Sequence, residues 1–297
     1  MTIVAFTGAV ELGLIYALLA LGIFVNYRIL GVADLTVEGS FTAGASVSAI
    51  FIVAGQPLLG VVTAAGFGAL AGLCSAFLQT KMRIQPILAG ILTMTALYSV
   101  NLGIMGGRSN IPLLRVDTLF NMVTIQNWRT ILPAMIVLGA GSALGVFFHT
   151  RLGLSVRATG DNEDMVRASS INSAFTKSVG LAIGNALAAL SGAIIAQYQG
   201  FADIGMGFGM VVVALASLII GEAIFGRRSV IWNIGAVSAG AVIYRVILAL
   251  VLSFRLNPAN LRAISALIVA IAISYPAVKN QWAVYALKAK NERARNA

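Results

Sequence analysis

The chain has 297 residues, of which 59% are hydrophobic and only 10% are charged. Soluble domains carry about 25% charged residues, so this composition excludes an ordinary soluble protein and indicates an integral membrane protein. The net charge of +10 does not indicate nucleic-acid binding, because the basic residues flank apolar runs instead of forming a stripe. One cysteine, Cys74, excludes an internal disulfide, and with one histidine, His149, it argues against a metal site.

The apolar runs predict an all-α polytopic membrane protein with about nine spans (eight to ten), since a span takes about 20 apolar residues. No basic segment precedes the first run, so we interpret it as a retained span and not as a cleaved signal peptide. The second and seventh runs are short or interrupted by glycine, which predicts broken or re-entrant segments. The expected spans are Ile3–Val25, Ser40–Val53, Leu58–Gln79, Ile84–Met105, Ile131–Phe148, Val179–Gln199, Phe208–Phe225, Val230–Phe254 and Ala263–Tyr275.

The distribution of lysine and arginine predicts that the N-terminus is outside and the C-terminus is cytoplasmic. With this orientation fourteen basic residues fall inside and five outside, while Arg245 lies within a span. Cytoplasmic loops are enriched in lysine and arginine, so the split favours this orientation. Three glycine pairs at helix-packing spacing predict tight packing within the chain more than a dedicated dimer face. The pairs are Gly68 with Gly72, Gly141 with Gly145, and Gly180 with Gly184.

A short motif occurs twice, as Gly31-Val-Ala-Asp34-Leu35 and as Gly200-Phe-Ala-Asp203-Ile204. The predicted orientation places the first copy inside and the second outside, so the two halves form an inverted repeat. In transporters, broken segments at matching places in two halves indicate the transport route. Asp34 and Asp203 either cap the helices that follow them or help to bind an anion there. Glu38 is either a functional carboxylate near membrane depth or an interfacial acid that faces water.

Polar residues on the two broken segments and the adjoining spans form a candidate translocation pathway. Hydrogen bonds that join helices explain each of them equally well. These residues are Asp34, Thr36, Glu38, Ser40, Thr42, Thr93, Asn101, Asn185, Gln197 and Asp203. Glu222 is expected to pair with the two arginines that follow it, whereas the partner of Arg245 cannot be identified from the sequence.

The segment Thr159–Asn172 contains three of the ten acidic residues of the chain, Asp161, Glu163 and Asp164. We expect a short helix that begins with Asp161 as its cap and has Asp164 in a capping-box position. A helix of roughly ten residues is marginal on its own, so it must rest on its own protein or on a partner. Its mixed charge argues against lying in lipid and favours a cytoplasmic partner.

Sequence motifs for catalysis are missing. The chain has no Gly-x-x-x-x-Gly-Lys-[Ser/Thr] sequence, so it cannot itself be a P-loop ATPase. It also lacks a His-Glu-x-x-His sequence, and its one histidine is followed by a basic residue at a membrane boundary. We therefore expect a transport subunit that is not an enzyme and that has no catalytic residue.

Several motifs resemble the permeases of bacterial ABC importers that serve ribose and branched-chain amino acids. The loop sequences His149–Gly153, Arg157–Glu163 and Ser170–Asn172 are similar to the cytoplasmic loop of these permeases. Asp34–Gly39 is similar to the sugar members except for Glu38, and Glu222 stands where those members tend to have glycine. The resemblance extends from Ile3 to Tyr275. Two segments are most similar to a branch labelled tryptophan/tyrosine transport permeases, namely Ala33–Ser40 and Ala196–Asp203.

The resemblance implies a homodimer, two cytoplasmic ATPase subunits that bind ATP and magnesium, and an external substrate-binding protein or lipoprotein. The implied location of the protein is the cytoplasmic (inner) membrane of a bacterium. The chain itself would hold no cofactor. The implied domain is a single permease domain, 1–297, with half-bundles at 3–148 and 178–276, a coupling loop at 155–177 and a basic cytoplasmic tail at 277–297. The implied ATPase-coupling residues are Gly160, Asp161, Asn162, Glu163, Asp164, Met165, Arg167, Ile171 and Asn172.

Two alternatives to this function stay open. One is an ion-coupled secondary transporter with coupling carboxylates at Asp34, Glu38, Asp203 and Glu222, and the other is a purely structural membrane protein. For an importer, we expect an amino acid as substrate, with aromatic ones ahead of branched-chain ones. A nucleoside or sugar is the alternative substrate.

Overall fold

The computed structural model describes residues 3–114, 116–123, 127–253, 267 and 270. Seven helices in this part of the chain are long and apolar enough to cross a membrane, and an eighth apolar helix is shorter. The elements are α1 (Ile3–Ile23), η1 (Phe24–Ile29), α2 (Thr36–Val53), α3 (Pro57–Thr80), α4 (Pro86–Ile104), β1 (Asn110–Pro112), α5 (Trp128–His149), α6 (Arg151–Asp161), α7 (Glu163–Ala168), α8 (Ser173–Gln199), β2 (Phe201–Asp203), α9 (Met210–Phe225) and α10 (Val230–Ser253).

The described helices match eight of the nine predicted spans. Pro57 and Pro86 stand at the first turns of α3 and α4, where a proline costs no intrahelical hydrogen bond. The predicted ninth span, Ala263–Tyr275, lies outside the described residues apart from Leu267 and Ala270, as does the whole basic tail. The described part of the chain therefore accounts for eight apolar helices and not for nine.

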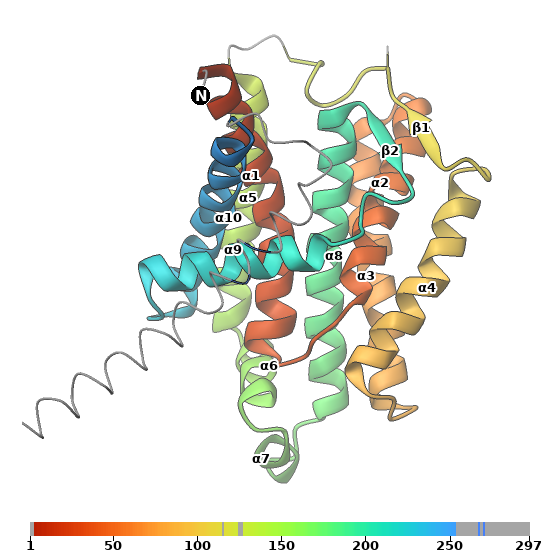
Figure 1. The fold of residues 1–297 in the computed structure, drawn as a ribbon. Coiled ribbons are helices and arrows are strands. Elements are labelled where there is room, and N and C mark those ends of the chain that lie inside the picture. Colours follow the sequence, from red (N-terminus) through yellow and green to blue (C-terminus); the bar gives the residue numbers. More distant parts are fainter. Residues whose placement is uncertain (1–2, 115, 124–126, 254–266, 268–269, 271–297) are drawn as a thin grey trace, which may run out of the picture.

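The bundle is built around α1, which contacts α5, α8, α9 and α10 (Figure 1). Small residues bring the other helices close together. A Cβ added to Gly72 of α3 would lie 2.3 Å from the carbonyl oxygen of Leu181 in α8, and one added to Gly184 would lie 2.0 Å from Asn26 Oδ1 in η1. The predicted packing role of these glycines within the chain is thus confirmed. Around Gly141 and Gly145 the packing is looser.

The packing of the helices follows the same order in the two copies of the repeated motif. Helices α1, α2 and α3 correspond to α8, α9 and α10, because α3 packs on α8 as α10 packs on α1. Both connecting segments begin with a glycine of positive φ, +68° at Gly31 and +77° at Gly200. In each copy an aspartate accepts a hydrogen bond from the N–H two residues on: Asp34 Oδ1 from Thr36 at 3.0 Å, and Asp203 Oδ1 from Gly205 at 2.8 Å.

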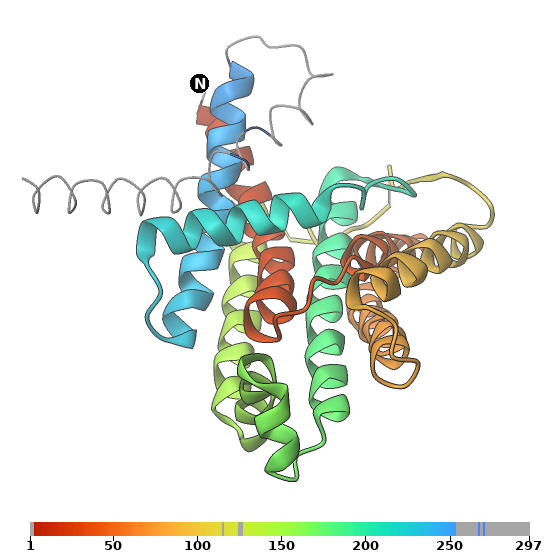
Figure 2. The same cartoon turned by 60° about the horizontal axis from the view of Figure 1, so that its bottom comes forward.

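The second broken segment consists of β2, a turn and α9. β2 pairs with β1 in a two-stranded antiparallel sheet that places Asn110 opposite Asp203. Figures 1 and 2 show α9 crossing the bundle instead of running along it. At 16 residues α9 is shorter than the spanning helices. The structure therefore confirms that this segment is broken, whereas the first segment, α2, is a full-length helix of 18 residues.

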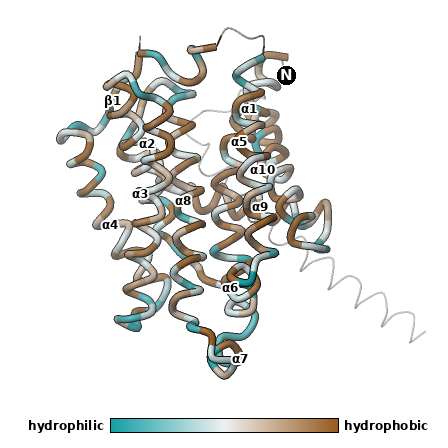
Figure 3. The backbone as a smooth tube through the Cα atoms, turned by 180° about the vertical axis from the view of Figure 1, so that it is seen from behind, coloured by the Kyte–Doolittle hydropathy of each residue, from teal (hydrophilic) through white to brown (hydrophobic). Residues whose placement is uncertain are grey.

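The two ends of the bundle differ. The N-terminus, β1 and β2 lie at one end, and α6 and α7 extend beyond the other (Figure 1). Hydrophilic residues gather toward these ends and on α6, whereas the helices between them are mostly hydrophobic (Figure 3). The loop that contains α6 and α7 is thus on the side opposite to the N-terminus, as the sequence predicted.

Candidate functional site

Asp34 is the centre of a buried hydrogen-bond network. Its side chain is 3% exposed, and its two oxygens accept four hydrogen bonds from four parts of the fold. The donors are the backbone N–H of Thr36 (3.0 Å), the amides of Asn26 (3.3 Å) and Asn185 (2.7 Å), and the hydroxyl of Ser75 (3.3 Å). Ser40 donates in turn to Asn185 Oδ1 at 2.7 Å. The network joins η1, α2, α3 and α8, so Asp34, Ser40 and Asn185 hold the bundle together.

Glu38 lies beside a cavity of about 240 Å³ between α2, α4 and the turn that joins β2 to α9. Its Oε1 accepts a hydrogen bond from Gly209 N–H at 3.0 Å, which ties α2 to the second broken segment. Thr42 and Asn101 line the same cavity, and Asn101 donates to the Gly39 carbonyl at 3.2 Å. Asn101 Oδ1 is buried without a hydrogen-bond partner among the described residues.

Three of the predicted pathway residues, Glu38, Thr42 and Asn101, therefore share one cavity, whose aromatic wall is formed by Tyr98 and Phe208. A carboxylate, an amide and an aromatic wall suit a small solute that has both a hydrogen-bonding group and an apolar part.

The other predicted pathway residues lie elsewhere. Gln197 accepts from the Leu119 N–H at 3.0 Å and so fixes the loop between β1 and α5. Thr93 donates to Ala89 O within its own helix at 2.9 Å. Asp203 is held in the β1–β2 ribbon, where Asn110 donates to it at 3.4 Å. Thr36 Oγ1 is buried without a partner in the described part of the chain. These four do not join Glu38 in its cavity.

The loop between α5 and α8 differs from the expected single helix. α6 ends at Asp161, and a separate six-residue helix, α7, begins after Asn162. Asn162 is its cap, because its Oδ1 accepts a hydrogen bond from Met165 N–H at 3.0 Å. The prediction that Asp161 caps this helix is therefore wrong. Asp and Asn cap helices equally well, and the two residues are neighbours here. The sequence alone therefore could not decide between Asp161 and Asn162 as the cap of α7.

α7 rests on α8 of its own chain. Glu163 binds both Lys177 of α8, at 2.5 Å, and Arg167, at 2.6 Å. Arg167 also donates to Ser173 at 3.0 Å. Burial raises the pKa of the Glu163 carboxyl, but Lys177 and Arg167 outweigh burial and leave that pKa below its ordinary value. Glu163 thus anchors α7 to its own chain, a role that the sequence analysis did not predict.

The side chains of α7 divide between an inner and an outer side. Val166 is 1% exposed and packs inward, whereas Met165 is 55% exposed. Two further predicted coupling residues are structural: Gly160 lets α6 approach the Ile29 carbonyl of η1, and Asn172 caps α8 by accepting from Phe175 N–H at 3.1 Å. Asp161, Asp164 and Ile171 also lie on or beside this loop, so all the predicted coupling residues belong to one projecting unit.

The structure shows the contacts of Glu222 and Arg245, which the sequence predicted only in part or not at all. Glu222 at the end of α9 binds Arg227 as predicted, at 2.5 Å, and also binds Arg28 of η1 at 2.9 Å. The Arg28 contact was missed, because nothing in a sequence indicates that η1 and α9 meet. Arg245 lies over the ring of Tyr16, with 3.8 Å between its guanidinium carbon and the ring centroid. No cluster of three or more metal-binding side chains is found among the described residues.

Comparison with known proteins identifies relatives along most of the chain. A family model described as "Branched-chain amino acid transport system / permease component" matches residues 6–274. A tyrosine transport system permease protein of Clostridioides difficile (strain R20291) is 37% identical over 257 residues, which are 86% of each chain. An uncharacterized protein of Rickettsia prowazekii (strain Madrid E), RP368, is 36% identical over 274 residues, covering 90% of this chain and 95% of that protein.

Two solved structures share the fold. A chain described as a metal-chelate type ABC transporter in an inward-facing conformation has a TM-score of 0.50 and 18% identity, and the match covers 93% of this chain and 85% of that one. PsaBC from Streptococcus pneumoniae in complex with Fab has a TM-score of 0.51 and 16% identity, with 90% and 89% covered. At these identities the likeness shows the fold alone.

The family match and the two relatives confirm the resemblance predicted from the loop motif and from the segments Ala33–Ser40 and Ala196–Asp203. The chain belongs to the branched-chain amino acid transport system permease family, and it is a multi-pass membrane protein.

Proposed function

We propose that this chain is the permease subunit of an ATP-driven importer that moves an amino acid, aromatic ones ahead of branched-chain ones, into a bacterial cell. It acts in the cytoplasmic membrane as a homodimer, with two ATPase subunits on the inner side and a binding protein or lipoprotein outside. The chain itself is not an enzyme, and the partner ATPase binds ATP and magnesium. The relative that is named a tyrosine transport system permease supports an aromatic amino acid.

The geometry of α7 is the observation that carries this proposal. α7 extends beyond the end of the bundle opposite to the N-terminus (Figure 1). The ion pairs of Glu163 and the burial of Val166 fix it to α8, while Met165 faces outward on the same short helix. A firmly anchored helix with an exposed apolar side chain can transmit a push from a soluble partner to α8. Because α8 is hydrogen-bonded to Asp34 through Asn185, that push reaches the centre of the bundle.

The substitution Met165→Asp tests the ATPase contact. A charge in place of this apolar side chain is costly when a partner buries it, so we expect the ATPase to be lost on purification and uptake to vanish. Met122→Asp is the matched control, because Met122 is 60% exposed and lies in the loop between β1 and α5, at the other end of the molecule. It should leave ATPase recruitment unchanged.

Normal uptake by the Met165→Asp variant, at normal membrane abundance, would contradict the coupling role. The substrate class needs a separate measurement. Tryptophan, tyrosine, leucine and ribose are each titrated calorimetrically into the binding protein whose gene lies beside that of this chain. Heat from ribose alone would contradict the amino-acid substrate.

A further inference from the structure

A second cavity lies between α1, α9, α10 and β2, apart from the Glu38 cavity. Its volume is about 550 Å³, which falls in the range of pockets that hold small molecules. It contains one basic group, one acidic group and several aromatic rings. The described residues that bear them are Tyr16, Phe201, Asp203, Phe208, Tyr244 and Arg245.

Arg245 is the unusual member of this set. It belongs to the spanning helix α10, where a charged side chain is costly unless it has a partner or a function. Among the described residues no carboxylate forms an ion pair with it, and its Nε is buried without a hydrogen-bond partner. The cation–π contact with the Tyr16 ring offsets part of the charge, but the ring supplies no oxygen or nitrogen that could accept a hydrogen bond from the five guanidinium N–H groups.

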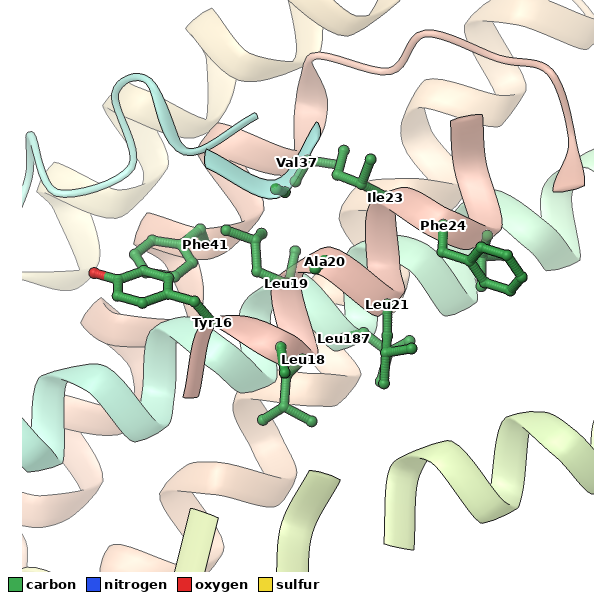
Figure 4. Packing of buried hydrophobic residues seen from close by; sticks show 14 of the residues in the cluster. Tyr16, Leu18, Leu19, Ala20, Leu21, Ile23, Phe24, Val37, Phe41 and Leu187 are labelled. Carbon is green, nitrogen blue, oxygen red and sulfur yellow. The ribbon is translucent and has the colours of Figure 1, made fainter. Parts of the chain in front are cut away.

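The residues around Arg245 hold it in a defined position. Tyr16 is buried and stacks on Phe41, with ring centroids 6.1 Å apart and planes 10° from parallel. Figure 4 shows these two rings side by side among the packed side chains of α1 and α2. Tyr244, the neighbour of Arg245 on α10, is fully buried, and its hydroxyl has no hydrogen-bond partner in the described part of the chain. Tyr244 and Arg245 both line the cavity, and a guanidinium held against a buried ring is suited to binding a carboxylate.

Asp203 contributes the opposite charge to the same cavity without forming an ion pair with Arg245. The β1–β2 ribbon and the Gly205 N–H hold its carboxylate in place. A cavity that has separate positive and negative groups fits a ligand that carries both charges. The rings of Phe201 and Phe208 supply an apolar wall for the rest of such a ligand.

We propose that this cavity binds a zwitterionic amino acid with its α-carboxylate on Arg245, its ammonium group toward Asp203 and its side chain against the aromatic wall. This inference rests on the proposed function, because it gives that importer a substrate site within the permease itself. β2 lies at the end of the bundle that carries the N-terminus, which is the external side in the predicted orientation (Figure 1). Phe208 lines both this cavity and the Glu38 cavity, so it stands between the two.

The test uses the whole transporter, permease with its ATPase, in nanodiscs and without the binding protein. Binding of radiolabelled L-tryptophan is competed with tryptamine, which lacks the carboxylate, and with indole-3-propionate, which lacks the ammonium group. Arg245→Gln should weaken L-tryptophan and indole-3-propionate about ten- to a hundredfold and leave tryptamine unchanged, since a lost hydrogen bond to a charged group has about this effect. Asp203→Asn should weaken L-tryptophan and tryptamine and leave indole-3-propionate unchanged.

Two controls keep the outcome interpretable. Arg245→Lys retains the charge over Tyr16 but not the planar fork, so it should fold like the wild type and bind more weakly than it. Arg108→Gln removes an exposed positive charge from the loop before β1 and should bind L-tryptophan normally. Melting temperature and co-purification of the ATPase show whether each variant has folded.

The proposal is overturned if the wild type binds none of the three ligands, if Arg245→Gln binds L-tryptophan as the wild type does, or if both substitutions weaken all three ligands equally. Failure of the proposed function looks different. In that case the wild-type complex shows no ATP hydrolysis that responds to the loaded binding protein, whatever the cavity binds.

Discussion

Asp34 and Asp203 are equivalent residues of the two repeats, yet their surroundings are different. Asp34 accepts four hydrogen bonds inside the bundle, whereas Asp203 accepts one from Gly205 and one from Asn110 at the end of the molecule. An asparagine at position 34 would point an N–H₂ group at donors that now bind a carboxylate.

We therefore expect Asp34→Asn to destabilise the protein by about 1–3 kcal/mol, the range for a buried group that loses its partner. The measurement is the melting temperature of the purified protein in detergent. Asp203→Asn is the matched control and should lower it much less. Equal shifts for the two variants would show that the buried network adds nothing beyond the turn that both aspartates form.

Glu38 connects α2 to the second broken segment through its hydrogen bond to Gly209 N–H. Glu38→Gln keeps the size and the acceptor oxygen but removes the charge, so uptake should fall about tenfold or more if the charge itself serves transport. Radiolabelled amino-acid uptake at matched membrane abundance is the measurement. Thr95→Val alters another residue of the same cavity that bonds only within its own helix, and uptake should stay near normal. Full uptake by Glu38→Gln would make Glu38 a structural contact.

At the residue scale, the sequence showed which side chains are charged or polar, but it seldom showed which residues they contact. The pairing of Glu222 with Arg227 follows from their closeness in the chain, and the structure confirms it. Arg245 and Tyr16 are far apart in the chain, and an apolar run gives no sign of which helices meet. For the same reason the sequence could not tell that Asn185 binds Asp34 while Asn101 faces a cavity.

Helix α7 depends on the charge of Glu163, whose pKa lies below its ordinary value of 4.5. A depressed pKa means that the ion pairs stabilise α7 at pH values above about 4.5, and that this stability is lost as the pH falls through the folded-state pKa. Because Arg167 is well exposed, its pair with Glu163 contributes only about 0.2–1 kcal/mol.

Hydrogen exchange of the α7 amides, corrected for intrinsic rates, should therefore be unchanged from pH 8 to pH 5 and faster below pH 4.5. Glu163→Gln should show the faster exchange already at pH 7 and no such step. A step of equal size in both proteins would assign the pH dependence to another group.

At the element scale, the long helices were predictable because each consists of a membrane-length apolar run. Short elements were not. The strands β1 and β2 have three residues each and no alternating pattern to mark them. The break between α6 and α7 depends on one side-chain hydrogen bond of Asn162, and its neighbour Asp161 is an equally good cap.

The whole molecule has an orientation that labelling can test. Leu114 is exposed after β1, and Met165 is exposed on α7 at the opposite end (Figure 1). In a Cys74→Ser background expressed without the ATPase, which would cover position 165, Leu114→Cys should react with an impermeant thiol reagent in intact cells, and Met165→Cys only after the cells are opened. The reverse pattern would overturn both the orientation and the proposed ATPase contact, because both require α7 to be cytoplasmic.

The buried position of α1 has a consequence for biosynthesis. Its partners α8, α9 and α10 are made much later than α1, yet Leu18 and Leu21 of α1 are fully buried in the structure. In a nascent chain, α1 must therefore stay in contact with lipid until its partner helices are inserted. Its mean hydropathy of 2.1 makes α1 stable in the bilayer during that time. Ribosome-stalled chains that end before α8 should hold α1 inserted but accessible to a lipid-phase crosslinker at Leu18, and release past α10 should close that access.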